Sequence, residues 1–308
     1  MLNNNLVRWY NQNKERIWRV IIIVAFVIII IRLANYFAGE NLKKQNENAR
    51  VNKTTNTETT KIQTNSILTN TVVGKEMAEK SNDIIDEFVK YCNNGEMEKA
   101  YSLISDDCKE ALYKSEEQFK TEYYNIIFNG NKLYTKENLY SNGNSVTYRV
   151  NFTNNLLADG GLKSGESFDD YITIVKKEND EYKLNIGQFI DKKEINKEYE
   201  DDNIKIEVIY KNIFREYEIY NIKFTNKTEN ESIIYDEESN WYVIDNNGKN
   251  YEASMNEIPY SWLKLIPQVP QSLNVKFIKT YNVDKYIQKL TLKNIKINDK
   301  YIDVEIEL

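Results

Sequence analysis

The side chains available for chemistry are mainly carboxylates, because the 308-residue chain contains no histidine and only two cysteines. The absence of histidine removes imidazole acid-base catalysis, histidine-activated nucleophiles and most zinc and iron sites. Adjacent acids do occur, but neighbours in sequence seldom converge, and none has the spaced ligands and central glycine of an EF-hand loop. The pairs are Asp86-Glu87, Asp106-Asp107, Asp169-Asp170, Asp201-Asp202 and Glu237-Glu238. We expect no catalytic residue, cofactor or metal, so the protein is predicted not to be an enzyme; a carboxylate-only enzyme is the alternative.

A more promising segment for recognition is the apolar stretch 259–267, which is bounded by prolines inside a polar, turn-rich region. An exposed tryptophan in such a loop would suit a protein contact. The alternative is a loop that folds back to cap the neighbouring sheets. The residues that we select as a candidate protein contact are Tyr260, Trp262, Leu263, Leu265 and Ile266.

Net charge and cysteine placement exclude further classes of function. The formal net charge of -6 and the lack of a convincing basic cluster argue against a nucleic-acid partner. Cys92 and Cys108 each fall in the apolar stripe of an expected helix, which favours buried free thiols over a disulfide.

The N-terminal region contains a hydrophobic segment that is long enough to cross a bilayer. Residues 20–31 are unbroken apolar, and residues 17–38 give a helix of roughly 20 residues. Trp18, Arg19, Arg32 and Tyr36 mark its ends. A cleaved signal peptide is the competing interpretation, but in the segment Tyr36-Phe37-Ala38 the bulky Tyr36 occupies a position where a cleavage site requires a small residue. We expect an uncleaved transmembrane helix with the lipid bilayer as a partner.

The orientation of this helix depends on a small charge bias, because lysines and arginines are nearly balanced on its two sides. Glu15 is the single acid among the first nineteen residues, and long domains translocate largely regardless of charge. We therefore expect residues 1–16 to be a cytoplasmic tail and the C-terminal domains to be extracytoplasmic, on a single-pass protein of the cell membrane. Residues 39–75 are rich in Asn, Thr, Lys and Gln and are predicted to be a disordered polar linker.

Residues 76–191 carry a helical pattern that changes to a strand pattern. Ile84, Ile85, Phe88 and Cys92 share a helix face, and the segment 115–118 (SEEQ) has the form of a capping box. The period becomes two from about residue 133, which predicts helices followed by a curved antiparallel sheet in an α+β domain. Its aromatic residues line a conical pocket or fill the core; Tyr123, Tyr124 and Phe168 are the examples.

This order, with segments 94–105 (NGEMEKAYSLIS) and 115–119 (SEEQF), resembles the cone-shaped fold named after nuclear transport factor 2. The superfamily includes enzymes, ligand binders and scaffolds. A membrane anchor followed by such a domain also resembles the bitopic scaffold proteins of conjugative type IV secretion systems. The resemblance implies an architecture and transfers no catalytic residue.

Short segments of residues 204–308 alternate between apolar and polar side chains, after a charged connector expected at residues 191–203. The alternation gives about seven short strands separated by turns, which predicts an all-β sandwich. Segments 221–228 (NIKFTNKT) and 241–251 (WYVIDNNGKNY) resemble immunoglobulin-like domains of Gram-positive surface proteins. That resemblance implies adhesion or assembly.

These features together predict a non-enzymatic, membrane-tethered extracytoplasmic interaction or assembly protein, such as a scaffold of a conjugation or secretion apparatus. The expected partners are other membrane or cell-surface proteins, a second copy in a homo-oligomer included. The alternative is a surface protein that binds a small ligand or the cell wall through the pocket of the first domain.

Overall fold

The computed structural model describes residues 73–155 and 167–308. No helix in these two ranges combines the length and apolar character that a bilayer crossing requires. The predicted tail at 1–16, the predicted anchor at 17–38 with its ends Trp18, Arg19, Arg32 and Tyr36, and most of the predicted linker lie outside the described residues.

The first part of the described chain begins with helices. Helix α2 (Lys75–Asn93) buries Ile85, Phe88 and Cys92 along one stripe. It is followed by Asn94 and Gly95, and the positive φ of 72° at Gly95 suits glycine. Ser105 and Ser115 cap later helices by accepting backbone N–H bonds, and the bond from Gln118 to Ser115 measures 3.2 Å. The helical segments are α2 (Lys75–Asn93), α3 (Met97–Ser102), α4 (Asp106–Leu112), α5 (Glu116–Phe119), the π-helical η1 (Lys120–Tyr124) and α6 (Asn125–Ile127).

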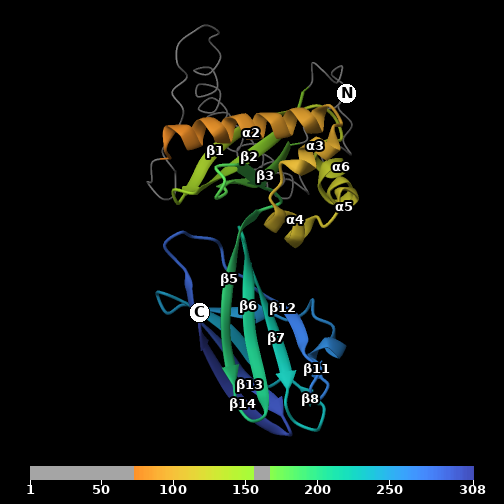
Figure 1. Cartoon of the computed structure of the whole chain (residues 1–308), viewed down its shortest axis with the longest axis vertical. Coiled ribbons are helices and arrows are strands. Elements are labelled where there is room, and N and C mark those ends of the chain that lie inside the picture. The colour runs from red at the N-terminus through yellow and green to blue at the C-terminus, as the bar shows by residue number, and fades with distance from the viewer. Residues whose placement is uncertain (1–72, 156–166) are drawn as a thin grey trace, which may run out of the picture. The chain divides into compact units, whose positions relative to one another are not determined.

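An antiparallel sheet in the order β1-β2-β3-β4 follows these helices, and it curls strongly against α2 (Figure 1). Its strands are β1 (Lys132–Ser141), β2 (Ser145–Asn154), β3 (Ser167–Lys176) and β4 (Tyr182–Asn185). The prediction of helices followed by a curved antiparallel sheet is therefore confirmed.

Aromatic rings occupy the space between the helices and this sheet. Phe88 lies 6.3 Å from Phe119, and Phe128 lies 5.5 Å from Phe152, measured between ring centroids. Tyr123 is buried among them. Phe168 on β3 is instead 39% exposed, so the aromatic residues considered for a shared conical pocket do not meet in one. Tyr123 is a core residue, as the filled-core interpretation expects.

The loop between β4 and the next strand, β5 (Phe189–Glu200), approaches the helices closely at Gly187. Its φ is +64°, and a Cβ atom there would lie 2.5 Å from the hydroxyl of Tyr113. We expect Gly187→Ala to lower the free energy of unfolding by about 2 kcal/mol, because positive φ strain adds to this clash. Chemical denaturation measures the loss.

The control for Gly187→Ala is Gly248→Ala. Gly248 has a φ of +80°, but a methyl group added there would have open space around it. This replacement should cost only about 1 kcal/mol, the conformational part of the penalty. Tyr113→Phe removes the clashing hydroxyl and should partly rescue Gly187→Ala. Equal losses at both glycines would show that the contact with Tyr113 is unimportant.

The second part of the chain is built from further β-sheets. An eight-stranded sheet has the order β14-β13-β9-β10-β12-β7-β6-β5, and β11 pairs separately with β8. The strands are β5 (Phe189–Glu200), β6 (Ile204–Phe214), β7 (Glu218–Asn226), β8 (Ser232–Ile233), β9 (Asn240–Asp245), β10 (Asn250–Ser254), β11 (Lys264–Leu265), β12 (Gln271–Phe277), β13 (Ile287–Ile297) and β14 (Lys300–Glu307). One helical turn, η2 (Tyr260–Leu263), precedes β11.

Strand β10 is the point at which the long sheet changes direction. Residues 250–252 pair with β9, whereas Ala253 and Ser254 pair with β12. The two portions of the sheet enclose one apolar core, in which Trp241 stacks on Phe224 with 5.5 Å between ring centroids. The expected all-β organisation of this region is therefore confirmed.

The charged segment 191–203 was expected to be a connector, and that prediction was wrong. Most of it belongs to β5, which pairs along β6. A bulge between Glu194 and Lys197, with Asn196 at a φ of 52°, breaks the alternation by which a strand is recognised in sequence.

Candidate functional site

The loop predicted as a protein contact divides into buried and exposed residues. Strand β11 pairs with β8, and this pairing holds Leu263 and Leu265 in the core. Tyr260, Trp262 and Ile266 remain 58%, 52% and 55% exposed. The two leucines therefore cap the neighbouring sheets, and the other three residues are available for a protein contact. Val269, which the sequence analysis did not select, is exposed beside them.

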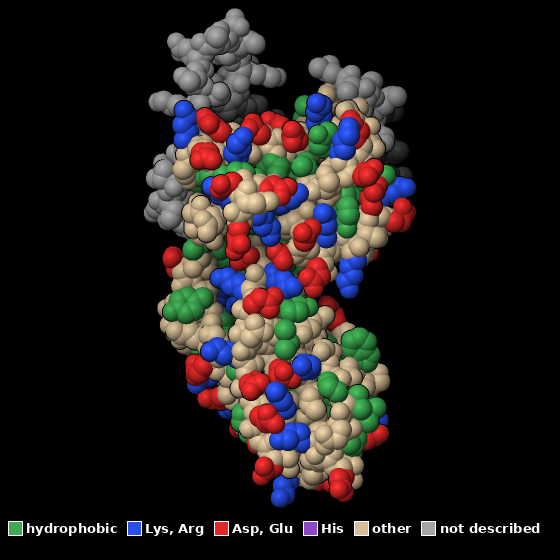
Figure 2. Space-filling view, in the orientation of Figure 1, with side chains coloured by type: hydrophobic (Ala, Val, Ile, Leu, Met, Phe, Trp, Pro, Cys, Tyr) green, Lys and Arg blue, Asp and Glu red, His purple; other side chains and the backbone are tan. Residues whose placement is uncertain are grey.

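A small cavity of about 300 Å³ adjoins Trp262. Ile219, Ile258, Pro259 and Leu273 supply apolar lining, while Lys276 pairs with Glu257 at 3.2 Å beside them. Figure 2 shows hydrophobic side chains gathered on the face near β11 and β12. We call Tyr260, Trp262, Ile266 and Val269 the tryptophan surface; it combines protruding apolar side chains with an adjacent hollow.

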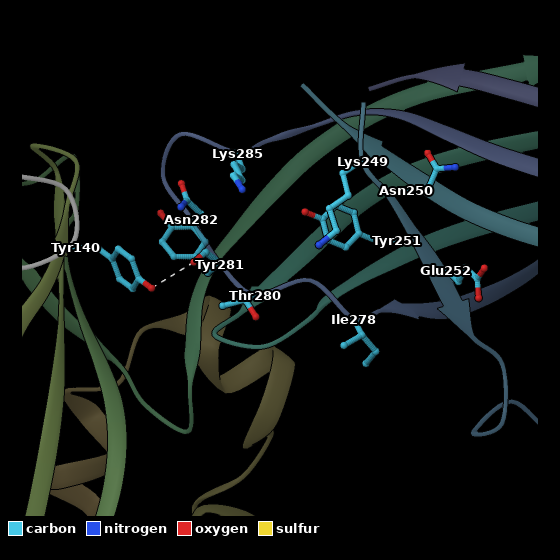
Figure 3. A pocket seen from close by; sticks show the side chains of 10 residues that line it. All are labelled: Tyr140, Lys249, Asn250, Tyr251, Glu252, Ile278, Thr280, Tyr281, Asn282 and Lys285. Atoms are coloured by element: carbon cyan, nitrogen blue, oxygen red, sulfur yellow. Dashed lines mark hydrogen bonds between the residues drawn. The ribbon is translucent and has the colours of Figure 1, made fainter. Parts of the chain in front are cut away.

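A larger groove of about 710 Å³ lies between the β9–β10 turn and the segment after β12 (Figure 3). It forms where β10 leaves β9 to pair with β12. Tyr140 reaches it from β1 and donates a hydrogen bond to the carbonyl of Tyr281 at 3.3 Å. Its lining residues are Tyr140, Lys249, Asn250, Tyr251, Glu252, Ile278, Thr280, Tyr281, Asn282 and Lys285.

Hydroxyl, amide and ammonium groups give this groove its polar character. The ammonium of Lys249 lies 4.8 Å from the centroid of the Tyr251 ring. The Tyr251 hydroxyl donates to Asp245 at 3.0 Å, which fixes the ring. Burial raises the pKa of Tyr281 to about 12, so its hydroxyl is neutral at physiological pH. The groove was not predicted from the sequence.

A buried ionic cluster lies on β6 and β7 and just beyond β12. Glu218 accepts bonds from Lys211 and Lys279, both at 2.9 Å, and from the Tyr220 hydroxyl at 2.8 Å. Burial alone would raise the pKa of Glu218, but the two lysines outweigh it and lower that pKa. Burial lowers the pKa of Lys211. The lysines hold the carboxyl in its ionised form, so it is unsuited to act as a general acid.

A second buried carboxylate, that of Asp170 on β3, accepts four hydrogen bonds. It accepts bonds from the Tyr123 hydroxyl at 2.7 Å and from the backbone N–H groups of Tyr171, Gly187 and Gln188 at 2.7, 3.0 and 3.1 Å. Its neighbour Asp169 instead forms a surface ion pair with Arg149. The adjacent acids at this pair therefore do not converge on one site.

The two cysteines are free and buried, as predicted. Burial raises the pKa of both thiols, that of Cys108 to about 12. A thiol that stays protonated is a poor nucleophile and a poor metal ligand. Within residues 73–155 and 167–308, no group of three or more Cys, Asp or Glu side chains is placed to hold a metal ion.

No family model, curated protein or solved structure matches this chain. Its function must therefore be inferred from the tryptophan surface, the groove and the buried clusters.

Proposed function

We propose that the protein is a non-enzymatic, membrane-tethered interaction or assembly protein that contacts a partner protein through the tryptophan surface. The observation that carries this proposal is the exposure of Tyr260, Trp262 and Ile266 on a loop anchored by β11. Large aromatic and aliphatic side chains beside a hollow are typical of the residues that dominate protein interfaces. Because Leu263 and Leu265 are packed in the core, the loop is held in place before binding, which limits the entropy lost on association.

The remaining parts of the proposal concern architecture and location. Residues 17–38 form the membrane anchor, and the linker that follows, which ends before the buried Val73, spaces the folded region from the extracytoplasmic surface of the bilayer. The α-helices and curled sheet correspond to a domain of the nuclear transport factor 2 type, and the β-rich part corresponds to an immunoglobulin-like domain. This combination is consistent with a scaffold in a conjugation or secretion apparatus, with other membrane or cell-surface proteins, or a second copy, as the partner.

The proposal is tested with Ser261→Cys in the full-length chain on intact cells, using a membrane-impermeant thiol crosslinker; Ser261 is exposed in the same loop, and its replacement keeps Trp262 in place. Cys92 and Cys108 are buried, so they give little background. We expect labelling from outside and crosslinking to a defined protein partner. Tyr301→Cys, on β14, is the matched exposed control and should be labelled without capturing that partner. The double variant Tyr260→Ser/Ile266→Ser, combined with Ser261→Cys, should reduce capture at least about tenfold, because interface anchors carry most binding energy.

Two outcomes would contradict this proposal. Absence of labelling at both positions on intact cells, with labelling after lysis, would place the folded region on the inner side. Equal capture from positions 261 and 301 would show that the tryptophan surface has no specific partner.

A further inference from the structure

The groove between the β9–β10 turn and residues 278–285 offers a different kind of recognition from the tryptophan surface. Its volume of about 710 Å³ lies in the range of sites that hold small molecules or short chains. Two segments distant in sequence form its walls, and the bend in β10 creates the space between them. Figure 3 shows that lysine, tyrosine and asparagine side chains supply most of its lining.

Two lysines give the groove a site for negative charge. Among the described residues, neither Lys249 nor Lys285 has a carboxylate within ion-pair distance, although many other lysines of these sheets do. Both side chains are exposed, so their ammonium groups can bind an acidic group without breaking an ion pair, and Lys249 would do so from its place over the Tyr251 ring. Charge-assisted hydrogen bonds from such groups are stronger than neutral ones.

The uncharged lining favours a ligand with many hydroxyl groups. Asn250, Asn282 and Thr280 bring amide and hydroxyl groups, and Tyr251 and Tyr281 bring half-buried aromatic rings. Amide and hydroxyl groups match the alternating donors and acceptors of a sugar, and a flat ring packs against the apolar face of a pyranose. Tyr281 is held by an edge contact with Tyr140, with 5.1 Å between ring centroids.

We propose that this groove binds an acidic saccharide, a sugar chain that carries carboxylate or phosphate groups. Lys249 and Lys285 pair with the acidic groups, and Tyr251 and Tyr281 stack against the sugar rings. The site is separate from the tryptophan surface, so either activity can be lost without the other.

The test is calorimetric titration of the full-length chain in detergent with four probes. These are a uronic-acid tetrasaccharide, a sugar-phosphate oligosaccharide, a neutral tetrasaccharide and a short polyglutamate peptide. We expect at least one of the two acidic oligosaccharides to bind, and to bind more tightly than the neutral tetrasaccharide and the polyglutamate peptide. Comparing the uronic-acid and sugar-phosphate probes distinguishes a carboxylate ligand from a phosphate ligand. The double variant Lys249→Gln/Lys285→Gln should weaken that binding at least about tenfold, as expected for lost charge-assisted bonds.

The matched control is Lys293→Gln/Lys300→Gln. Lys293 lies over the Tyr242 ring at 5.9 Å, an arrangement like that of Lys249 over Tyr251, but neither residue lines the groove. The Lys293→Gln/Lys300→Gln variant and a Trp262→Ser variant should both bind the acidic oligosaccharide as tightly as the wild type. The proposal is overturned if neither acidic oligosaccharide binds, if the neutral sugar or polyglutamate binds as tightly, or if both lysine pairs weaken binding equally.

Discussion

Replacing Glu218 with glutamine is expected to lower the free energy of unfolding by about 4 kcal/mol, the cost of leaving a buried charge without its partner. Glu218 is the common acceptor for Lys211, Lys279 and the Tyr220 hydroxyl, and all four side chains are buried. An amide keeps the shape but removes the negative charge between the two lysines. Urea denaturation followed by tryptophan fluorescence measures the change.

Two comparisons separate lost charge from disturbed packing. Glu305→Gln removes an exposed partner of Lys289 and should cost less than about 1 kcal/mol. Lowering the pH supplies the second comparison, because the pKa of Glu218 is depressed in the folded state. Its contribution is complete above its ordinary pKa and disappears as pH falls through the folded-state pKa. The difference between wild type and Glu218→Gln should therefore shrink in acid; a constant difference would indicate packing damage.

Regular elements of this fold could be predicted where burial is periodic and local. The cap at Ser115 depends on residues only three apart, and the alternation of Ile204, Ile206 and Val208 follows from one buried sheet face. Strand β5 was not predicted from the sequence for two reasons. Most of its residues are charged, and a bulge at Asn196 interrupts the alternation of buried and exposed side chains. Strand periodicity records burial, so a largely exposed strand leaves only a weak signal.

The candidate sites depend on contacts that sequence spacing does not contain. Prolines and bulky residues identified the loop 259–267, but only the pairing of β11 with β8 determines that Leu263 and Leu265 are buried. The groove depends on the bend in β10, and Glu218 meets a lysine 61 positions away. Sequence reasoning therefore located a candidate surface and missed the groove and the ionic cluster.

A second large loss of stability is expected when Asp170 is replaced. Asp170→Asn should lower the free energy of unfolding by about 3 kcal/mol, because buried donors would lose acceptors. Asp170 receives four hydrogen bonds, and the two from the backbone N–H groups of Gly187 and Gln188 tie β3 to the Gly187 turn. An asparagine offers one acceptor oxygen, and its NH₂ group would face donors. Thermal and urea denaturation measure the loss.

Asp169→Asn is the matched control, since the same change is made one residue earlier on the same strand. Asp169 points to the surface and pairs with Arg149 at 2.6 Å, an exposed interaction worth less than about 1 kcal/mol. Tyr123→Phe removes only the hydroxyl donor, so it should cost less than Asp170→Asn and lessen the effect of that change in the double variant. If Asp169→Asn and Asp170→Asn were equally damaging, the loss would come from strand propensity, and the buried hydrogen bonds would not be its cause.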